Sequence, residues 1–196
     1  MSTERPLRAD ARRNRARILE TARAAFAAEG VGVSLDEIAR RAGVGPGTVH
    51  RHFPTKEALF EAAVTEHLQQ LTDQARSALR ADEAGSAFFG FLRQMIDDAD
   101  AKQDLTDTLA RAGTPLGDGT LRAAAELREV FAELLTRAQR TGRVRPDVDA
   151  SDVHAIVLAA LTAQAQRSDP SHPARVANLV LDCLRPAHRP ATARPR

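Results

Sequence analysis

The chain has little of several residue types, and each shortage excludes a class of protein. Its 196 residues contain one cysteine, Cys183, which excludes an internal disulfide and a metal site built from several cysteines. No apolar run reaches the roughly eighteen residues that a membrane-spanning helix needs. The opening stretch MSTERPLRAD lacks the apolar segment of a secretory signal, so we expect a cytoplasmic protein with no membrane partner.

The sequence also lacks the short motifs of common enzyme classes. It has no G-x-S-x-G nucleophile turn, no phosphate-binding P-loop, no H-E-x-x-H zinc motif and no G-x-G-x-x-G dinucleotide motif. Its serines, histidines and acidic residues are scattered. We therefore expect no catalytic residues, no cofactor and no metal site.

The net charge of +2 conceals an uneven distribution along the chain. Residues 1–60 hold 11 Lys/Arg and 7 Asp/Glu, a net charge of +4, whereas residues 61–184 hold 13 and 19, a net charge of −6. A basic N-terminal region attached to an acidic body is typical of a DNA-binding protein with a separate sensing domain. Solvated surface arginines are the alternative explanation of the basic region.

The most informative segment is SLDEIARRAGVGPGTVHRHFPTKEALF, residues 34–60. Ser34 and Glu37 have the spacing of a capping box, in which each side chain bonds the backbone amide of the other residue, so a helix should begin here. Gly43 can adopt the left-handed conformation that ends a helix, and Pro46 suits the first turn of the next one. Two short helices joined by a glycine turn indicate a helix-turn-helix, whose second helix enters the DNA major groove.

The second of these helices has an inward and an outward face. Val49 and Phe53 are one helical turn apart and should point into the core. The outward and flanking positions are Gly47, Thr48, His50, Arg51 and His52. Glycine at the outward face would allow the DNA backbone to approach closely. The two histidines should not share a metal ion, because residues two apart in a helix point in different directions.

These residues resemble the TetR/AcrR family of bacterial transcription regulators, whose pattern runs roughly I-A-x-x-A-G-V-x-x-G-T-L-Y-x-Y/H-F-x-x-K-x-x-L. The matching positions are Ile38, Ala39, Ala42, Gly43, Val44, Gly47, Thr48, Val49, His50, His52, Phe53, Lys56 and Leu59. One of them, His50, replaces the family tyrosine that contacts a phosphate. The resemblance covers about residues 10–60, and the later segment RTGRVRPDVDASDV resembles members that have SbtR-like C-terminal domains.

The resemblance implies phosphate or base contacts at Thr48, His50, His52 and Lys56. From its outward position we add Arg51, which can donate two hydrogen bonds to guanine; a solvated charge is the alternative. Ser34 can touch a phosphate while it caps its helix, or it can act only as a cap. The predicted DNA contacts are therefore Ser34, Gly47, Thr48, His50, Arg51, His52 and Lys56.

Elsewhere the apolar residues repeat with helical spacing, without strand alternation or an internal repeat. We expect a disordered basic arm over residues 1–9, a flexible tail over 185–196, and helices between them. The expected helices run from Asp10 to Gly30 and over about 55–79, 84–100, 103–112, 118–141, 150–166 and 173–184, in addition to the helix-turn-helix. The predicted fold is all-α, with a helix-turn-helix domain over 10–54 and a helical effector-binding and dimerisation domain over 55–184.

The resemblance implies two functions for the helical body. A small-molecule effector would occupy a cavity lined by Phe88, Phe91, Met95, Leu105, Leu109, Phe131 and Leu135, although such apolar stripes are more often ordinary core. The last two helices would form a dimer interface through Val153, Ile156, Ala160, Val176, Leu179 and Cys183. The alternative is that these two helices only complete the core of one subunit.

We therefore predict a homodimeric transcription regulator, a repressor that a small-molecule effector releases from a palindromic DNA operator. A shift of the helix that starts at Thr55 would carry the signal. Two other classes stay open: a constitutive or architectural DNA-binding protein without an effector, and an all-α ligand-binding protein or enzyme with a vestigial head.

Overall fold

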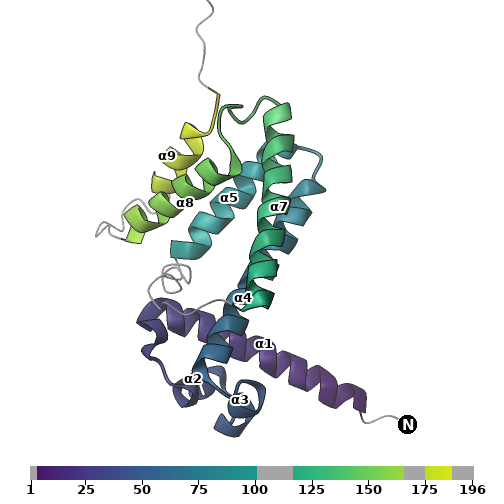
Figure 1. Cartoon of the computed structure of the whole chain (residues 1–196), viewed down its shortest axis with the longest axis vertical. Coiled ribbons are helices and arrows are strands. Elements are labelled where there is room, and N and C mark those ends of the chain that lie inside the picture. The colour runs from purple at the N-terminus through teal and green to yellow at the C-terminus, as the bar shows by residue number, and fades with distance from the viewer. Residues whose placement is uncertain (1–3, 101–116, 166–174, 187–196) are drawn as a thin grey trace, which may run out of the picture. The chain divides into compact units, whose positions relative to one another are not determined.

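The computed structural model describes residues 4–100, 117–165 and 175–186, and all its regular structure is helical (Figure 1). The elements in chain order are α1 (Glu4–Glu29), the short 3-10 helix η1 (Gly30–Gly32), α2 (Leu35–Ala42), α3 (Pro46–His52), α4 (Lys56–Leu79), α5 (Ala84–Asp100), α7 (Asp118–Arg140), α8 (Ala150–Ala165) and α9 (Arg175–Cys183). None of the described residues lies in a strand, which confirms the all-α fold class. Within the same ranges, every helix is too short or too polar to cross a membrane.

Most helices lie where the sequence predicts them. The ends of α4, α5, α7 and α8 agree with the predicted ranges to within a residue or two, the usual uncertainty of a helix end. The first helix differs, because α1 begins at Glu4 and thus includes residues 4–9 of the predicted arm. Asp10 therefore does not cap a helix, and its carboxylate accepts a hydrogen bond from Arg13. The predicted helix over 103–112 lies outside the described residues.

The chain divides into two compact units. The first contains the described residues up to Leu71 together with 117–127, and the second contains 72–100, 128–165 and 175–186. α4 and α7 each supply residues to both units. The first unit thus extends beyond the predicted boundary at residue 54, because the first half of α4 supplies apolar side chains to the core of the helix-turn-helix.

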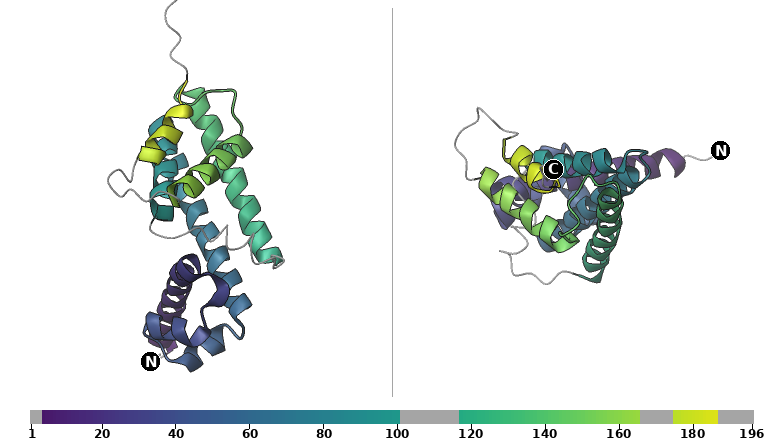
Figure 2. Two further views of the ribbon diagram at one scale, coloured as in Figure 1. Left: turned by 90° about the vertical axis from the view of Figure 1, so that its left-hand side faces the viewer. Right: turned by 90° about the horizontal axis from the view of Figure 1, so that it is seen from above.

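The core of the first unit joins α1, α2, α3 and α4, which are the purple and blue helices of Figure 2. Its side chains without exposed surface include Ile18, Ala22, Phe26, Ile38 and Val49. The ring of Phe26 meets the ring of Phe60 edge to face, with centroids 5.2 Å apart. Full burial of one such large side chain contributes about 1.5–3 kcal/mol. This core holds the two short helices in place, although helices of that length are not stable alone.

The core of the second unit is built from α5, α7, α8 and α9, together with Ala75 near the end of α4. Its fully buried side chains include Phe88, Leu92, Ile96, Leu134 and Val153. Arg137 donates to the backbone carbonyls of Leu79 and Ala81, which lie at the end of α4 and have no partner within that helix.

The helices of the second unit begin and end with recognisable local signals. α7 stops before Gly142, whose φ of 69° is left-handed and suits glycine. α8 begins with a reciprocal cap, in which Asp149 accepts from the amides of Ser151 and Asp152 and Asp152 accepts from the amide of Asp149.

Candidate nucleic-acid interface

The turn between α2 and α3 has the backbone geometry that the sequence predicts. Ser34 has extended backbone angles, and its hydroxyl accepts a hydrogen bond from the Glu37 amide at 3.2 Å, so its role as N-cap is confirmed. At the other end, Gly43 has φ 63° and ψ 37°. The amides of Gly43 and Val44 donate to the carbonyls of Arg40 and Ala39, which completes a Schellman motif. The turn is thus fixed by backbone hydrogen bonds rather than by long side chains.

The recognition helix α3 is short and anchored from one side. Gly45 precedes it, Pro46 occupies its first turn, and the Thr48 amide donates to the Gly45 carbonyl at 2.9 Å. Val49 is fully buried and Phe53 nearly so, as their spacing predicts. The remaining positions of α3 are therefore left on the surface of the first unit.

Gly47 and Arg51 occupy that outer surface. Both are exposed, and a Cβ atom placed on Gly47 would meet no protein atom within 4 Å. The Arg51 guanidinium forms no hydrogen bond or ion pair with another described residue. A cationic side chain beside an open stretch of helix backbone can bind a phosphate or a base edge.

A network of charges lies on α2, next to the turn. The Glu37 carboxylate accepts from Arg40 and from Arg41, with N–O distances of 2.7 and 2.8 Å, rather than from the Ser34 amide as the predicted capping box requires. Arg41 also donates to Glu29 at the end of α1. The hydrogen bonds from Arg40 and Arg41 hold the pKa of Glu37 at about 2, far below its ordinary value. This network ties α1 to α2 and leaves Arg40 with 73% of its side chain exposed.

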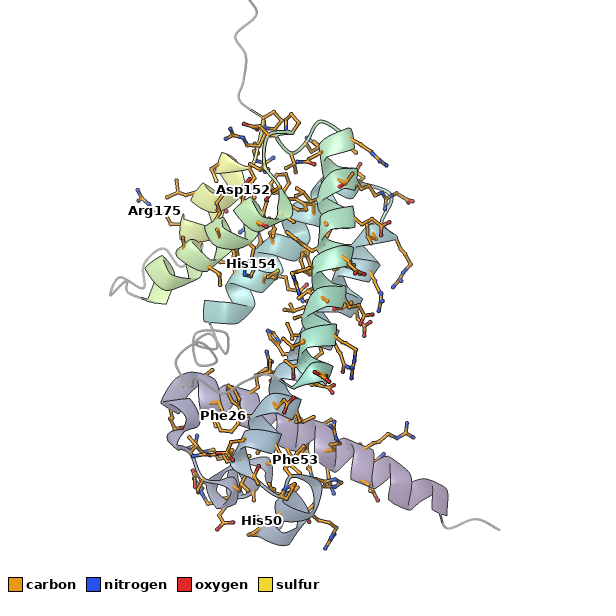
Figure 3. The ribbon with its side chains drawn as sticks, viewed as in Figure 1. Phe26, His50, Phe53, Asp152, His154 and Arg175 are labelled. Carbon is orange, nitrogen blue, oxygen red and sulfur yellow. The ribbon has the colours of Figure 1, made fainter. Side chains whose placement is uncertain are left out.

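The structure places His50 beside a residue that the sequence did not single out. His50 is labelled in Figure 3. Its Nε2 atom lies 3.1 Å from the carboxylate of Asp36, which belongs to the first turn of α2. The side chains of His50 and Asp36 are 52% and 71% exposed, so both reach the solvent. Asp36 was missed because its sequence position indicates only an acid near a helix N-terminus. The pairing depends on how α2 and α3 cross.

The start of α4 lies directly after α3 and completes the set of predicted contacts. Thr55 accepts a hydrogen bond from the Ala58 amide at 3.1 Å and so caps the start of α4. Lys56, the first residue of α4, is partly exposed, and His52 on α3 is exposed. The structure thus brings Thr48, His50, Arg51, His52 and Lys56 onto α3 and the first turn of α4, with Ser34 at the start of α2.

The arginines of α1 are of two kinds. Arg15 has partners within the first unit: its guanidinium lies 5.6 Å from the centre of the Phe53 ring and 3.8 Å from the Glu66 carboxylate. Arg12 is exposed and forms no hydrogen bond or ion pair within the described ranges. A free arginine on the first helix can neutralise a phosphate without reading a base.

A small hollow in the first unit is too small for an effector. It lies between α1 and α4, encloses about 30 Å³, and is lined partly by Arg23, Glu66 and His67. Such a volume holds little more than a water molecule.

The described residues among those predicted for the effector cavity lie in the core of the second unit. The rings of Phe88 and Phe131 are stacked with centroids 6.0 Å apart, and those of Phe91 and Phe131 are 6.1 Å apart. Leu135 is buried and Met95 is partly buried in the same core. Leu105 and Leu109 lie outside the described residues. The described members are thus core residues, and their role in binding an effector stays a prediction.

The residues predicted for the dimer interface divide into two groups. Val153 and Ala160 are buried by their own subunit, with 0% and 3% of their surface exposed, so they belong to its core and not to an outer face. Ile156 is partly buried, whereas Leu179 and Cys183 on α9 are exposed. The side chain of Val176 is outside the description. Any interface on these helices must therefore use their outer positions, such as Leu179.

Two known protein families match the sequence, one over the helix-turn-helix and the other over the C-terminal part of the chain. The family described as "Bacterial regulatory proteins, tetR family" matches residues 18–63. The family described as "Transcriptional regulator SbtR-like, C-terminal domain" matches residues 83–186. The first match covers the whole helix-turn-helix, and the second covers more than half of the chain. Both resemblances that the sequence indicates are thereby confirmed.

Solved structures and curated sequences agree with these matches. The TetR transcription regulatory protein of Mycobacterium vanbaalenii is 45% identical, with a TM-score of 0.72 over 92% of this chain and 100% of that one. A TetR transcriptional regulator of Streptomyces coelicolor is 32% identical, with a TM-score of 0.71 over 88% and 99% of the two chains.

Curated HTH-type transcriptional regulators of Staphylococcus aureus are 37% identical over 79 residues, which span 36% of this chain and 43% of theirs. The chain therefore matches less than half the length of these curated relatives. The two family matches and the two full-length structural relatives together settle the classification. The chain belongs to the TetR family of bacterial transcriptional regulators, with an SbtR-like C-terminal domain.

Proposed function

We propose that the chain is a homodimeric repressor that binds a palindromic DNA operator through α3 and releases it when a small molecule binds the second unit. The observation that carries this proposal is the surface of α3. Gly47 and Arg51 are exposed on a helix that Val49 and Phe53 anchor to the core. A short helix with a free guanidinium and an open backbone face suits the major groove.

A dimer follows from the way such a helix reads DNA. One α3 covers only a few base pairs, and two related by a two-fold axis can read half-sites about 34–36 Å apart. The outer faces of α8 and α9 carry exposed apolar or small side chains, namely Ala155, Ala159, Leu179 and Cys183. Leu179 is 60% exposed, so its apolar side chain is available for a contact with a second copy. This face supports an isologous contact between two copies.

Two observations support release by an effector: the chain belongs to the TetR family, and two of its helices contribute residues to both units. α4 and α7 each pass from the first unit into the second. An effector bound more tightly by one arrangement of these helices would shift the population toward that arrangement. The operator is released if the favoured arrangement spaces the two recognition helices wrongly.

The experiment is selection of bound duplexes from a random pool with the full chain at near-physiological salt. A palindromic consensus with half-sites one helical turn apart is the expected result. Binding without enrichment, fading steeply as salt rises, would leave only nonspecific attraction to phosphates. That outcome would favour the architectural protein or the vestigial head. Binding of the selected operator that no metabolite changes would favour a constitutive regulator.

A further inference from the structure

The pair formed by Asp36 and His50 is the least expected contact of the helix-turn-helix. It joins the first turn of α2 to the recognition helix through a single 3.1 Å contact between Oδ1 and Nε2. We propose that Asp36 is a positioning residue for His50. It engages the ring at Nε2 and leaves Nδ1 as the only ring atom free to meet a DNA phosphate. This inference rests on the proposed DNA-binding function.

The chemistry of the imidazole ring means that His50 can bond to a phosphate only when Nδ1 carries a proton. A carboxylate only accepts hydrogen bonds, so Nε2 must carry the hydrogen that it shares with Asp36. In a neutral ring Nδ1 then has a lone pair, which cannot bond to a phosphate oxygen. One proton taken from solvent puts an N–H on Nδ1 and a positive charge on the ring. His50 therefore donates to the phosphate only in its doubly protonated form, and operator binding takes up a proton at each such contact.

Asp36 is the carboxylate that bonds His50, because the other charged groups near His50 bond elsewhere or make no bond to it. The other charged groups of α2 bond elsewhere, since Arg40 and Arg41 share Glu37 and Arg41 also reaches Glu29. The remaining charged or titratable groups on α3, at the start of α4 and on α1 near Phe53 are Arg51, His52, Lys56, Glu57 and Arg15. The one carboxylate among them, Glu57, forms no hydrogen bond with His50. Arg51 and His52 make no hydrogen bond to a described residue. Asp36 and His50 supply only two metal donors, and the described part of the chain holds no group of three.

Asp36 could instead act only as a negative charge that repels DNA. A repelling charge weakens binding at every pH and does so whether or not residue 50 is histidine. A positioning residue acts through His50, so its effect depends on pH and disappears when the histidine is replaced. The two roles therefore differ in the shape of the pH profile.

The test measures the Kd of the full chain for its selected operator by fluorescence anisotropy between pH 5.5 and 8.5, at constant ionic strength. Wild type should lose roughly tenfold or more in affinity between pH 6 and 8, as uptake of one proton per subunit requires. Asp36→Asn should flatten this profile by strengthening binding at pH 8, because an amide can donate to Nε2 and leave Nδ1–H on a neutral ring. His50→Tyr should also flatten it, since a phenol donates at every pH in this range.

Two controls isolate the effect of the pair. His154→Gln removes an exposed histidine of α8 in the second unit, and it should keep both the wild-type affinity and the wild-type slope. In the His50→Tyr background, Asp36→Asn should leave the affinity nearly unchanged at every pH, whereas a gain by the same factor at every pH would assign Asp36 the role of a repelling charge. Circular dichroism melts of each variant at pH 6 and 8 establish that the compared proteins are folded.

A second readout needs no DNA. Long-range ¹H–¹⁵N NMR of the histidine rings at pH 8 should show the Nε2–H tautomer for His50 in wild type and a mixture of tautomers in Asp36→Asn. A wild-type ring in the Nδ1–H tautomer contradicts the proposal, as does a pH slope that survives in His50→Tyr. Sequence-selective but pH-independent binding removes only the role of this pair. Loss of sequence selectivity at every pH removes the DNA-reading function as well.

Discussion

The two units of this chain place their polar groups differently. In the first unit, exposed arginines and carboxylates form a network on the surface, made of Glu29, Glu37, Arg40 and Arg41. In the second unit, stacked aromatic rings such as Phe88 and Phe131 pack among aliphatic side chains. A unit that reads a charged polymer must keep cations on a rigid surface, whereas a sensing unit needs an apolar interior. The contrast supports the proposed division, in which the first unit binds DNA and the second binds the effector.

The largest expected effect comes from removing one large side chain from each core. Phe26→Ala and Phe88→Ala should each lower the free energy of unfolding by about 3–5 kcal/mol, because both rings are fully buried. If the units are energetically distinct, Phe26→Ala should weaken hydrogen-exchange protection mainly in α1–α3. Phe88→Ala should do so mainly in α5 and α8. Equal loss of protection throughout the chain in both variants would show one cooperative unit instead of two.

The second effect concerns the exposed apolar face of the second unit. Leu179→Glu should convert dimers to monomers in light scattering at micromolar concentration. Burial of a leucine contributes about 1.5–3 kcal/mol, and a two-fold axis doubles the effect. Leu121→Glu is the matched control, because Leu121 is 50% exposed on α7 but lies in the first unit. Persistent dimers in Leu179→Glu would place the interface elsewhere.

The third effect separates reading from attraction within the first unit. Arg51→Ala should cost about 1–3 kcal/mol on the selected operator and relax the preference at one position of each half-site. Arg12→Ala removes a free arginine from α1. It should weaken binding to all sequences alike and reduce the salt dependence. If Arg51→Ala lowers the affinity for all DNA sequences equally, Arg51 contacts a phosphate and does not read a base.

The smallest effect tests the charge network. The pKa of Glu37 lies at about 2 in the folded chain, below its value in the unfolded chain. Its contribution to stability is therefore complete above about pH 4.5 and disappears as the pH falls toward 2. Glu37→Gln should lower the Tm slightly at pH 7 and low salt, and the difference from wild type should vanish near pH 2 or in 1 M salt. A difference independent of pH would assign the effect of Glu37 to packing.

The sequence predicts the first unit better than the second, for physical reasons. The left-handed Gly43, the Ser34 and Thr55 caps and the buried Val49 and Phe53 all follow from local rules that hold wherever such residues occur. Interactions between helices were not predictable in this way. The contact of Asp36 with His50 requires the crossing of α2 and α3 to be known.

Burial in the second unit was also hard to predict. Helical periodicity identifies the apolar positions of α8, but it does not tell which neighbour covers them. Val153 and Ala160 were therefore expected at a dimer interface and are found in the core of their own subunit. The α1 start at Glu4 was missed for a different reason, because residues 4–9 are mostly polar and do not show the apolar periodicity that indicates a helix.

The most direct test of the account is the effect of one methyl group on the outer face of α3. A Cβ on Gly47 would meet no protein atom within 4 Å, and the same is true of Gly90 on α5. Both Gly→Ala changes should leave the fold intact and raise its stability by about 0.5–1 kcal/mol. If α3 lies against DNA, Gly47→Ala should weaken operator binding by about tenfold or more, roughly 1.4 kcal/mol, while Gly90→Ala binds as wild type does. Wild-type affinity in Gly47→Ala would contradict the placement of this face of α3 in the major groove.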